Sequence, residues 1–466
     1  MKQKLLTLFL LITVITVFAI PVVGQDEVAV PEVLTLPEQI AEGRDVTITV
    51  SNMPPADQAE NRATWEAQAA RFMELYPNVT IEGLELEYNP AAYVALAAGG
   101  QLPTLFMTYF TEPSKFIPQG VVADITPYIE AAGIEGVFNP NVLEITSADG
   151  AIYGIPLNAY ALGLAYNKDL LAAAGIDAPP TTWEELVEDA VALTDADAGR
   201  AGFAFINDGG GATGWHYTNI AYGFGATPTD IIAVNEDGTY SAAYGASEST
   251  VAALDYIHAL RWEHNVLPGA TLDWGSLSEA LMSERVAMAI YAGDQFNHVY
   301  FNFPDADLNK FGFAPAPAGP NGSVSLIGGN LYMVAANATP DQQEAATYFQ
   351  LWRQFDPAEV KAGLDAAAEA VGMPTLPLYV GDYQAAWEAF RAPYNKLPVE
   401  NYTLFTDAVK AGEVTLQPEP VTAVQDYYGE VGLVVSEVLS NEGVDVSARL
   451  AQSAEEFQSF VLDQVQ

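Results

Sequence analysis

The stretch of residues 149–194 constrains the fold of this chain most, because extended and helical patterns alternate within it. Asp149-Gly150 is a turn dipeptide, and two extended apolar runs follow it as far as Tyr166. Asn167 is a residue type that starts helices, and Gly175 is one that ends them. The pattern therefore predicts a turn, two strands and a short helix.

A second helix is predicted directly afterwards. Pro179-Pro180 prevents the first helix from continuing, and Thr182 lies three residues before Glu185 in the pattern of a capping box. Apolar residues then recur at helical spacing, namely Leu186, Val187, Ala190 and Leu193. Strands that alternate with helices in this way are typical of α/β proteins.

The region before this stretch shows the same alternation. We expect strands at 46–50, 79–88 and 105–107, and helices around Trp65 and at 93–98. This order predicts a doubly wound sheet, in which ligands bind beyond the carboxyl ends of the strands. A chain of 466 residues with 50% hydrophobic residues is long enough for two domains with their own cores.

Residues 1–24 have the pattern of a secretory signal peptide. Lys2 and Lys4 precede an apolar run at 5–20, and Pro21 and small residues precede a cleavage point before Gln25. The alternative is a leader retained as a membrane anchor, because the apolar run approaches spanning length. We therefore expect the protein to be exported and to work in a periplasm or outside the cell.

The chain has 0 Cys and a formal net charge of -43. Without cysteine it can form no disulfide and no thiolate metal site, and it cannot be anchored through a lipid on cysteine. The excess of acidic residues repels nucleic acid and anionic lipid, and no basic patch offsets it. We therefore expect no nucleic-acid partner and interpret the acidity as a contribution to solubility.

Motifs for catalysis and metal binding are weak. The 4 His residues form no pair at metal-ligand spacing. No Lys follows the glycine run at 207–214 to hold phosphate, and 195–199 begins like a calcium loop but lacks the later ligands. The sequence predicts no cofactor, no metal site and no catalytic residue.

A secreted glycoside hydrolase is the alternative function, because such an enzyme would also carry aromatic residues and many carboxylates. A β/α barrel would show about eight similar strand–helix units. The chain instead has strand–loop patterns separated by long helical stretches. This organisation favours a binding protein over an enzyme.

Several further segments carry a family resemblance together with residues 149–194. They are Gly100-Gln101-Leu102-Pro103 and the segments at 120–125, 280–290, 325–334 and 372–375. In order and spacing they resemble family 1 extracellular solute-binding proteins of ABC importers, the group that includes the maltose-binding proteins. The chain departs from this pattern at Thr104, where the family has aspartate, and at Gly293-Asp294-Gln295, where relatives have glycine-x-tryptophan.

The resemblance implies a two-lobed α/β fold of the class II-like periplasmic-binding-protein type, with a doubly wound sheet in each lobe. It places the first lobe at 25–153 plus 327–366 and the second lobe at 158–324 plus 367–466. The hinge would lie near 157–160 and 326–330. Ligand binding would then close the two lobes about this hinge.

The loops at the predicted strand ends carry aromatic and amide side chains and almost no Arg. Sugars present apolar C–H faces and a rim of hydroxyl groups, which suit such side chains. Anionic ligands instead need Arg or a helix N-terminus. We therefore expect a neutral sugar or oligosaccharide as the ligand.

The resemblance also indicates candidate ligand contacts. Trp215 and Trp274 correspond to aromatic residues of the relatives, Trp215 to one that stacks on sugar, and Tyr160 corresponds to a polar hinge contact. Asp294 could accept a hydrogen bond from a sugar hydroxyl, although the missing tryptophan weakens the case for maltodextrin itself. The remaining candidates are Asn52, Thr108, Tyr109, Asn330, and Tyr427 or its neighbour Tyr428. For each of them, packing in the core or exposure on the surface is the alternative.

Together these features predict the extracytoplasmic substrate-binding subunit of an ABC importer. Its partners would be the sugar and the permease subunits of the transporter, and it would act as a monomer. A sensory or adhesive binding protein without a transporter stays open as an alternative, because the sequence does not separate the two.

Overall fold

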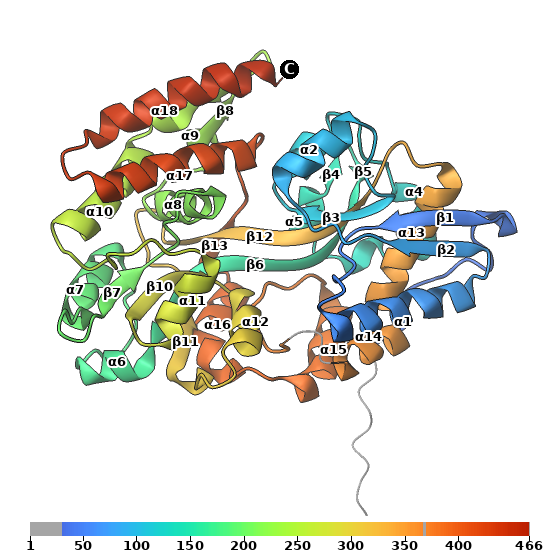
Figure 1. Cartoon of the computed structure of the whole chain (residues 1–466), viewed down its shortest axis with the longest axis horizontal. Coiled ribbons are helices and arrows are strands. Elements are labelled where there is room, and N and C mark those ends of the chain that lie inside the picture. Colours follow the sequence, from blue (N-terminus) through green and yellow to red (C-terminus); the bar gives the residue numbers. More distant parts are fainter. Residues whose placement is uncertain (1–29, 367–369, 466) are drawn as a thin grey trace, which may run out of the picture.

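Two long strands, β6 (Gly154–Asn167) and β12 (Ser323–Val334), cross the middle of the protein and join its two lobes (Figure 1). The computed structural model describes residues 30–366 and 370–465, so the predicted signal peptide at 1–24 lies outside the described residues. Across the described part of the chain, no helix is both long and apolar enough to cross a membrane. The arrangement is the two-lobed α/β fold predicted from the sequence.

We assign the N-terminal strands and the helices that cover them to the first lobe. Its strands are β1 (Val46–Val50), β2 (Val79–Gly83) and β3 (Leu105–Tyr109), with a small hairpin of β4 (Ser147–Ala148) and β5 (Ala151–Ile152). Its helices are α1 (Ala59–Leu75), α2 (Pro90–Ala98), α3 (Pro113–Phe116), α4 (Thr126–Ala132), α5 (Pro140–Ile145), α13 (Pro340–Phe355), α14 (Pro357–Asp365) and α15 (Gly381–Arg391).

We assign the remaining elements to the second lobe. Its strands are β7 (Ala201–Ala204), β8 (Ile232–Val234), β9 (Tyr240–Ala242), β10 (Val286–Ala292), β11 (Phe311–Ala314) and β13 (Val414–Gln417). Its helices are α6 (Lys168–Ala173), α7 (Trp183–Leu193), α8 (Gly211–Gly223), α9 (Pro228–Ile231), α10 (Glu248–Trp262), α11 (Trp274–Met282), α12 (Gln295–Asn302), α16 (Thr403–Ala411), α17 (Val424–Ser440) and α18 (Val446–Phe460).

The sheet of the first lobe has the strand order β2-β1-β3-β12-β6. β1 runs parallel to β2 and β3, whereas β12 runs antiparallel to β3 and to β6. The loops after the parallel strands β1 and β3 therefore open at the same edge, next to the point where the strand direction reverses. In open α/β sheets this edge is where ligands bind.

The crossing strands also belong to the second lobe. β6 pairs with β10 on one side and with β11 on the other, both antiparallel, and β10 pairs with β7 in parallel. β13 pairs with the first residues of β12. Every residue of β10 is buried, as expected for a central strand covered on both faces. Both lobes are thus built on one continuous sheet.

The helix starts predicted at Asn167 and Thr182 are confirmed. The Oδ1 of Asn167 accepts hydrogen bonds from the backbone N–H groups of Asp169 and Leu170, at 3.0 and 3.1 Å. The Oγ1 of Thr182 accepts one from the backbone N–H of Glu185 at 3.2 Å. These bonds satisfy backbone donors that a first helical turn leaves without a partner.

The predicted turn at Asp149-Gly150 is also confirmed. Both residues have positive φ angles, 51° and 81°, and they connect the strands of the β4–β5 hairpin. The two extended runs that follow form mainly one strand, β6, rather than two. Their division in the sequence marks the point where the strand passes from one lobe to the other, because its partners change there from β12 to β10 and β11.

Helix α15 packs on the first lobe, although the predicted boundary assigns all of 367–466 to the second. The rings of Tyr379 and Tyr383 lie 5.4 and 5.8 Å from the ring of Phe355, measured between centroids. Tyr379 also forms a backbone bridge with Phe138. We therefore propose that 376–391 belongs with the first lobe, and the other lobe boundaries stay predictions.

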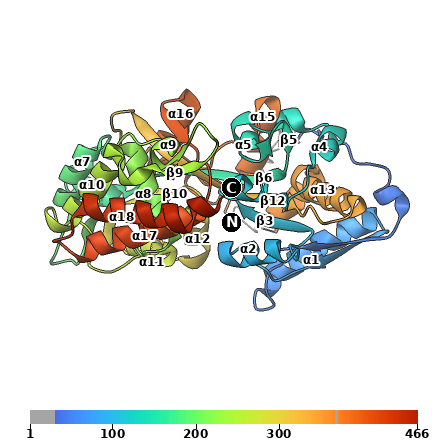
Figure 2. The same ribbon diagram turned by 90° about the horizontal axis from the view of Figure 1, so that it is seen from above.

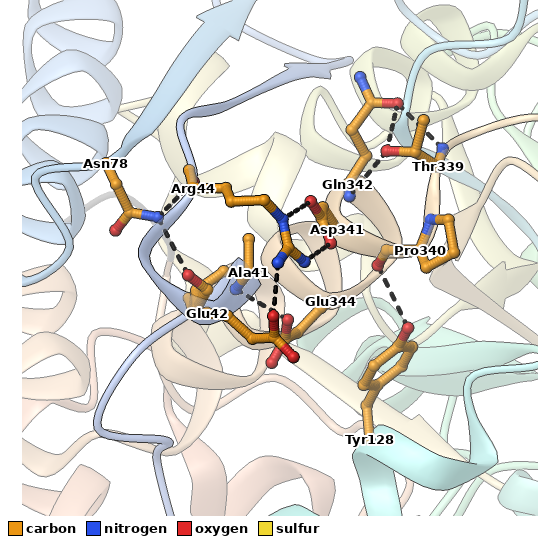
Figure 3. Close-up of polar contacts among 11 residues, drawn as sticks. Ala41, Glu42, Arg44, Asn78, Tyr128, Thr339, Pro340, Asp341, Gln342 and Glu344 are labelled. Atoms are coloured by element: carbon orange, nitrogen blue, oxygen red, sulfur yellow. Dashed lines mark hydrogen bonds and ion pairs between the residues drawn. The ribbon is translucent and has the colours of Figure 1, made fainter.

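The segment 40–44 attaches the start of the described chain to α13 (Figure 3). The guanidinium of Arg44 donates hydrogen bonds to both carboxylate oxygens of Asp341, at 2.9 and 2.8 Å, and pairs with Glu42. Glu344 accepts a hydrogen bond from the backbone N–H of Ala41 at 2.9 Å. Exposed ion pairs add little stability, so these contacts mainly determine the path of the segment.

Seen from above, α8, α10, α17 and α18 lie together on the second lobe, away from α1 and α13 (Figure 2). α8 and α17 approach each other closely at glycines. A Cβ atom on Gly214 would lie 2.2 Å from the carbonyl oxygen of Tyr428, and one on Gly432 would lie 2.3 Å from that of Gly210. This packing determines how Trp215, the next residue on α8, is placed.

We expect Gly214→Ala to lower the free energy of unfolding by about 1–3 kcal/mol, because the added methyl group would overlap the backbone of α17. Urea unfolding measures the change. The matched control is Gly429→Ala on α17, where a Cβ would meet nothing within 4 Å. That variant should be unchanged or more stable by about 0.5–1 kcal/mol. Equal losses in both variants would contradict the close approach of the two helices.

Candidate functional site

A cavity of about 630 Å³ lies between the lobes, beside the two crossing strands. Its walls come from the end of β3 and the loop after it, the middle of β6 and β12, the starts of α8 and α11, helix α12, and the segment 419–428. A cavity of this volume is typical of sites for small molecules. It lies at the edge of the sheet where the topology predicts a ligand site.

Six of the nine site residues predicted from the sequence line this cavity. They are Tyr109, Tyr160, Trp215, Trp274, Asp294 and Asn330. Tyr109 ends β3 in the first lobe, Tyr160 and Asn330 lie on the crossing strands, and the other three belong to the second lobe. Folding therefore brings together, from both lobes and the hinge, side chains that are far apart in the sequence.

Asn52 and Thr108 lie outside the cavity lining. Successive side chains of a strand point to opposite faces, so Thr108 points away from the cavity that Tyr109 lines, and it is fully buried. Asn52 follows β1 with a left-handed φ of 62°. Its Nδ2 donates a hydrogen bond to Sδ of Met107 at 3.1 Å, so this side chain packs against β3 rather than reaching the cavity.

Tyr427 also lies outside the lining, whereas its neighbour Tyr428 is part of it. The hydroxyl of Tyr427 accepts a hydrogen bond from Oγ1 of Thr218 at 3.3 Å, within the core between α8 and α17. Adjacent residues on a helix point in directions about 100° apart. The orientation of α17 on α8 therefore decides which of the two tyrosines faces the cavity.

Three aromatic side chains form a connected wall. The rings of Tyr160 and Trp215 meet edge to face with centroids 6.1 Å apart, and those of Trp215 and Trp274 lie 5.9 Å apart. Trp274 is 40% exposed, which leaves part of its ring open to a ligand. Gly328 on β12 makes this wall possible, because a Cβ there would lie 2.7 Å from the ring of Tyr160 and 3.0 Å from that of Trp215.

His216 supports the wall from behind. It is fully buried and meets the rings of Trp215 and Trp274 edge to face. Burial lowers the pKa of His216 to about 3, so the imidazole is neutral at neutral pH. Its Nδ1 accepts a hydrogen bond from the backbone N–H of Ile206 at 3.3 Å. The imidazole thus positions the two tryptophans.

Two carboxyl groups line the cavity, Asp294 before α12 and Glu419 after β13. Burial raises the pKa of Asp294 to about 7, although its own backbone N–H and that of Gln295 favour the charged form. Burial also raises the pKa of Glu419 well above its usual range, and the hydroxyl of Tyr428 donates a hydrogen bond to it. The buried surroundings of both carboxyl groups therefore disfavour their charged forms.

Two amide oxygens add acceptors to the site. Within the described part of the chain, Oδ1 of Asn330 and Oε1 of Gln295 are buried without a hydrogen-bond partner, and both residues line the cavity. The Nε2 of Gln295 donates to the carbonyl oxygen of Trp274 at 3.0 Å and to Oγ of Ser278 at 2.9 Å. Buried acceptors without partners are costly, so these oxygens are suited to receive hydroxyl groups of a ligand.

The lobes also touch each other beside the cavity. The Nε2 of Gln425 on α17 donates a hydrogen bond to Oγ1 of Thr111 in the first lobe at 3.0 Å. The Nζ of Lys115 on α3 lies 3.2 Å from a carboxylate oxygen of Asp426. Among the described residues that line the cavity, none is Lys or Arg. In residues 30–366 and 370–465 no group of three or more His, Asp or Glu is placed to hold a metal ion.

Sequence reasoning did not identify Glu419, Gln295 or Gln425 as site residues. Gln295 directly follows Asp294, which the sequence analysis had named as a candidate. The neighbouring position could therefore have been named as a candidate as well. Glu419 lies between Pro418 and Pro420, which indicates a fixed loop but carries no sign of its neighbours. Its place in the site results from long-range packing of the C-terminal region.

We expect the stability of the ligand-free protein to depend on the ionisation of Asp294. The pKa of this group rises from 3.8 to about 7 on folding. Its contribution to stability is therefore complete below about pH 4 and is lost as the pH rises through about 7. Asp294→Asn should remove this loss and be more stable than the native protein by on the order of 1–3 kcal/mol near pH 8, with water in the cavity reducing the effect.

Urea unfolding of both proteins near pH 5 and near pH 8 measures this difference. Glu236→Gln, at an exposed position of the second lobe, removes one acid without touching the cavity and serves as the control. The control should follow the native protein at both pH values. If Asp294→Asn and the native protein lost the same amount of stability between about pH 5 and about pH 8, the conclusion that burial raises the pKa of Asp294 would be wrong.

The family model described as bacterial extracellular solute-binding protein matches residues 55–352. A protein of Brucella abortus (strain 2308), named as a binding protein, is 29% identical over 246 residues, which are 52% of this chain and 54% of that protein. The maltodextrin-binding protein MdxE of Bacillus subtilis (strain 168) is 27% identical over 260 residues, 54% of this chain and 56% of MdxE. The chain thus matches about half the length of these relatives, both of which are named as binding proteins.

The fold is shared with solved structures. An ABC transporter solute-binding protein of Thermotoga lettingae TMO, bound with alpha-D-tagatose, has a TM-score of 0.68. It is 19% identical and the match covers 89% of this chain and 99% of that chain. At this identity the likeness shows the fold. The family model, however, covers more than half of the sequence, and this chain belongs to the bacterial extracellular solute-binding protein family.

Proposed function

We propose that this protein is the extracytoplasmic substrate-binding subunit of an ABC importer and that it binds a neutral sugar or oligosaccharide in the cavity between its lobes. The wall formed by Tyr160, Trp215 and Trp274 is the observation that carries the proposal. Sugars place their C–H faces on such rings. The partnerless amide oxygens of Asn330 and Gln295 suit the hydroxyl groups at the edge of a sugar.

The charges of the cavity and two of the similar proteins support the same ligand class. Ligands with phosphate or carboxylate groups usually meet Arg or Lys, and the described lining of the cavity contains neither. MdxE is named for maltodextrin, and the Thermotoga lettingae protein holds alpha-D-tagatose. Both of these ligands are carbohydrates.

Transport would depend on motion about the crossing strands. In the proposed cycle the lobes close over the sugar near 157–160 and 326–330, and the permease recognises the closed form. The contacts Gln425–Thr111 and Lys115–Asp426 join the lobes and would break when they open. We also propose that the protein works as an exported monomer, with its leader either cleaved or kept as an anchor.

The experiment that tests this proposal is calorimetric titration of refolded, ligand-free protein with monosaccharides, oligosaccharides, polyols, amino acids and peptides. Binding of one sugar class at micromolar concentration or below, with the sugar recovered intact, would support a binding protein. Recovery of cleaved sugar would favour the glycoside hydrolase alternative. Binding of amino acids or peptides alone would leave the fold unchanged and refute the ligand class.

We expect Trp215→Ala to weaken binding of that sugar by more than about tenfold, because a stacked ring contributes on the order of 1–2 kcal/mol or more. The matched control is Tyr427→Phe, which removes the hydroxyl contact with Thr218 behind the cavity and should leave affinity unchanged. Calorimetry measures both dissociation constants. Unchanged affinity in Trp215→Ala would remove Trp215 from the site.

A further inference from the structure

Asp294 and Glu419 are two acids of one cavity that has aromatic walls and, among its described lining residues, no Lys or Arg. We propose that these two carboxyl groups make the cavity select sugars by charge. Sugars that carry a protonated amine bind more tightly than their neutral parents, and sugars that carry a carboxylate or phosphate bind least. This inference rests on the proposed function, because it takes the ligand to be a carbohydrate.

The two acids act on the same part of the cavity. Tyr160 at the hinge has a raised pKa, first because of burial and then because of nearby groups that include Asp294 and Glu419. Tyr160 also meets Trp215 edge to face, at 6.1 Å between centroids. Tyr160, Trp215, Asp294 and Glu419 all line the same cavity, so a ligand that lies against this aromatic pair shares the cavity with both carboxyl groups.

Neither acid has a cationic partner among the described residues. Glu419 receives a hydrogen bond from the hydroxyl of Tyr428. The charged form of Asp294 is favoured by backbone N–H groups at the start of α12. The basic side chain of Lys115 on α3, beside the cavity, is already paired with Asp426 at 3.2 Å. The positive charge that would satisfy Asp294 and Glu419 is thus left for a ligand to supply.

An ammonium group would gain from this cavity in two ways. It would form charge-assisted hydrogen bonds with the carboxyl groups, which are stronger than those of a hydroxyl group. It would also lie near the faces of Trp215 and Trp274, where cations are attracted to aromatic rings. A carboxylate or phosphate in the same place would meet two acids and, among the described lining residues, no Lys or Arg to compensate its charge, which is a means of excluding a ligand as well as selecting one.

The alternative is that both carboxyl groups stay protonated with ligand bound and act as neutral partners of sugar hydroxyl groups. Their raised pKa values are compatible with this alternative as well. In that case an amine would gain nothing over a hydroxyl group at the same carbon. The ranking of matched sugars therefore separates the two explanations.

The test uses full-length, ligand-free protein and calorimetric titration near neutral pH. The probes are glucose, maltose, cellobiose and maltotriose, their 2-amino and 6-amino derivatives, and their 6-carboxylate and 6-phosphate derivatives. We expect the best amine derivative to bind about tenfold more tightly than its neutral parent, and the acidic derivatives about tenfold or more weakly. An acidic derivative that binds as tightly as its parent, or amines that give no gain, would overturn the inference.

Two variants assign the selectivity to the named acids. The variants are Asp294→Asn and Glu419→Gln. In at least one of them, the preference for the amine derivative over its neutral parent should fall to about twofold or less. The exposed control Glu236→Gln should keep the native preference. A preference that is unchanged in both cavity variants would overturn the assignment. The ranking measured on the native protein decides the inference even if a variant does not fold.

Failure of the inference and failure of the proposed function give different results. If no carbohydrate of any charge binds, the proposed function is refuted and the inference falls with it. If neutral sugars bind and acidic sugars bind equally well, the protein is still a sugar-binding protein and only the selection by charge is refuted.

Discussion

The pairing of β6 with β12 is the interaction on which the rest of the structure depends. The two strands are hydrogen-bonded from Ile327–Ala161 to Met333–Gly154, and each continues into the second lobe with other partners. Buried backbone groups must be paired, so the chain can pass between the lobes only where these ladders are maintained. The register shifts between Asn330 and Leu331, beside the cavity, and such irregularities commonly redirect side chains near functional sites.

The aromatic wall follows from this pairing. Gly328 is the register partner of Tyr160, and the missing side chain leaves the space that the rings of Tyr160 and Trp215 occupy. Trp215 is in turn placed by α8, whose close approach to α17 requires a glycine at 214. The aromatic wall of the site therefore depends on two glycines, Gly214 and Gly328, which themselves have no side chain with which to recognise a ligand.

The cavity also concentrates polar groups that folding alone does not satisfy. Asn330 and Gln295 keep acceptors without partners in the described structure, and Asp294 lies where burial disfavours its charge. Each such group costs stability in the ligand-free protein. A ligand that supplies the missing partners recovers this cost as binding free energy. Functional sites commonly combine these features, because the groups that recognise a ligand must be available before it arrives.

Local signals in the sequence determined much of this protein. The caps at Asn167 and Thr182, the turn at Asp149 and the alternation of strands and helices follow from preferences that act over a few residues, and they suffice to predict an α/β fold. The family resemblance indicated Tyr160, Trp215 and Trp274 of the cavity wall, but the expectation that they lie in loops at strand ends was wrong for Tyr160, which lies within β6, and for Trp215, which lies within α8. Tertiary structure alone decided that Tyr428 rather than Tyr427 faces the cavity, that Glu419 joins Asp294 there, and that α15 packs on the first lobe. These outcomes depend on how distant elements dock against one another, which no local preference encodes.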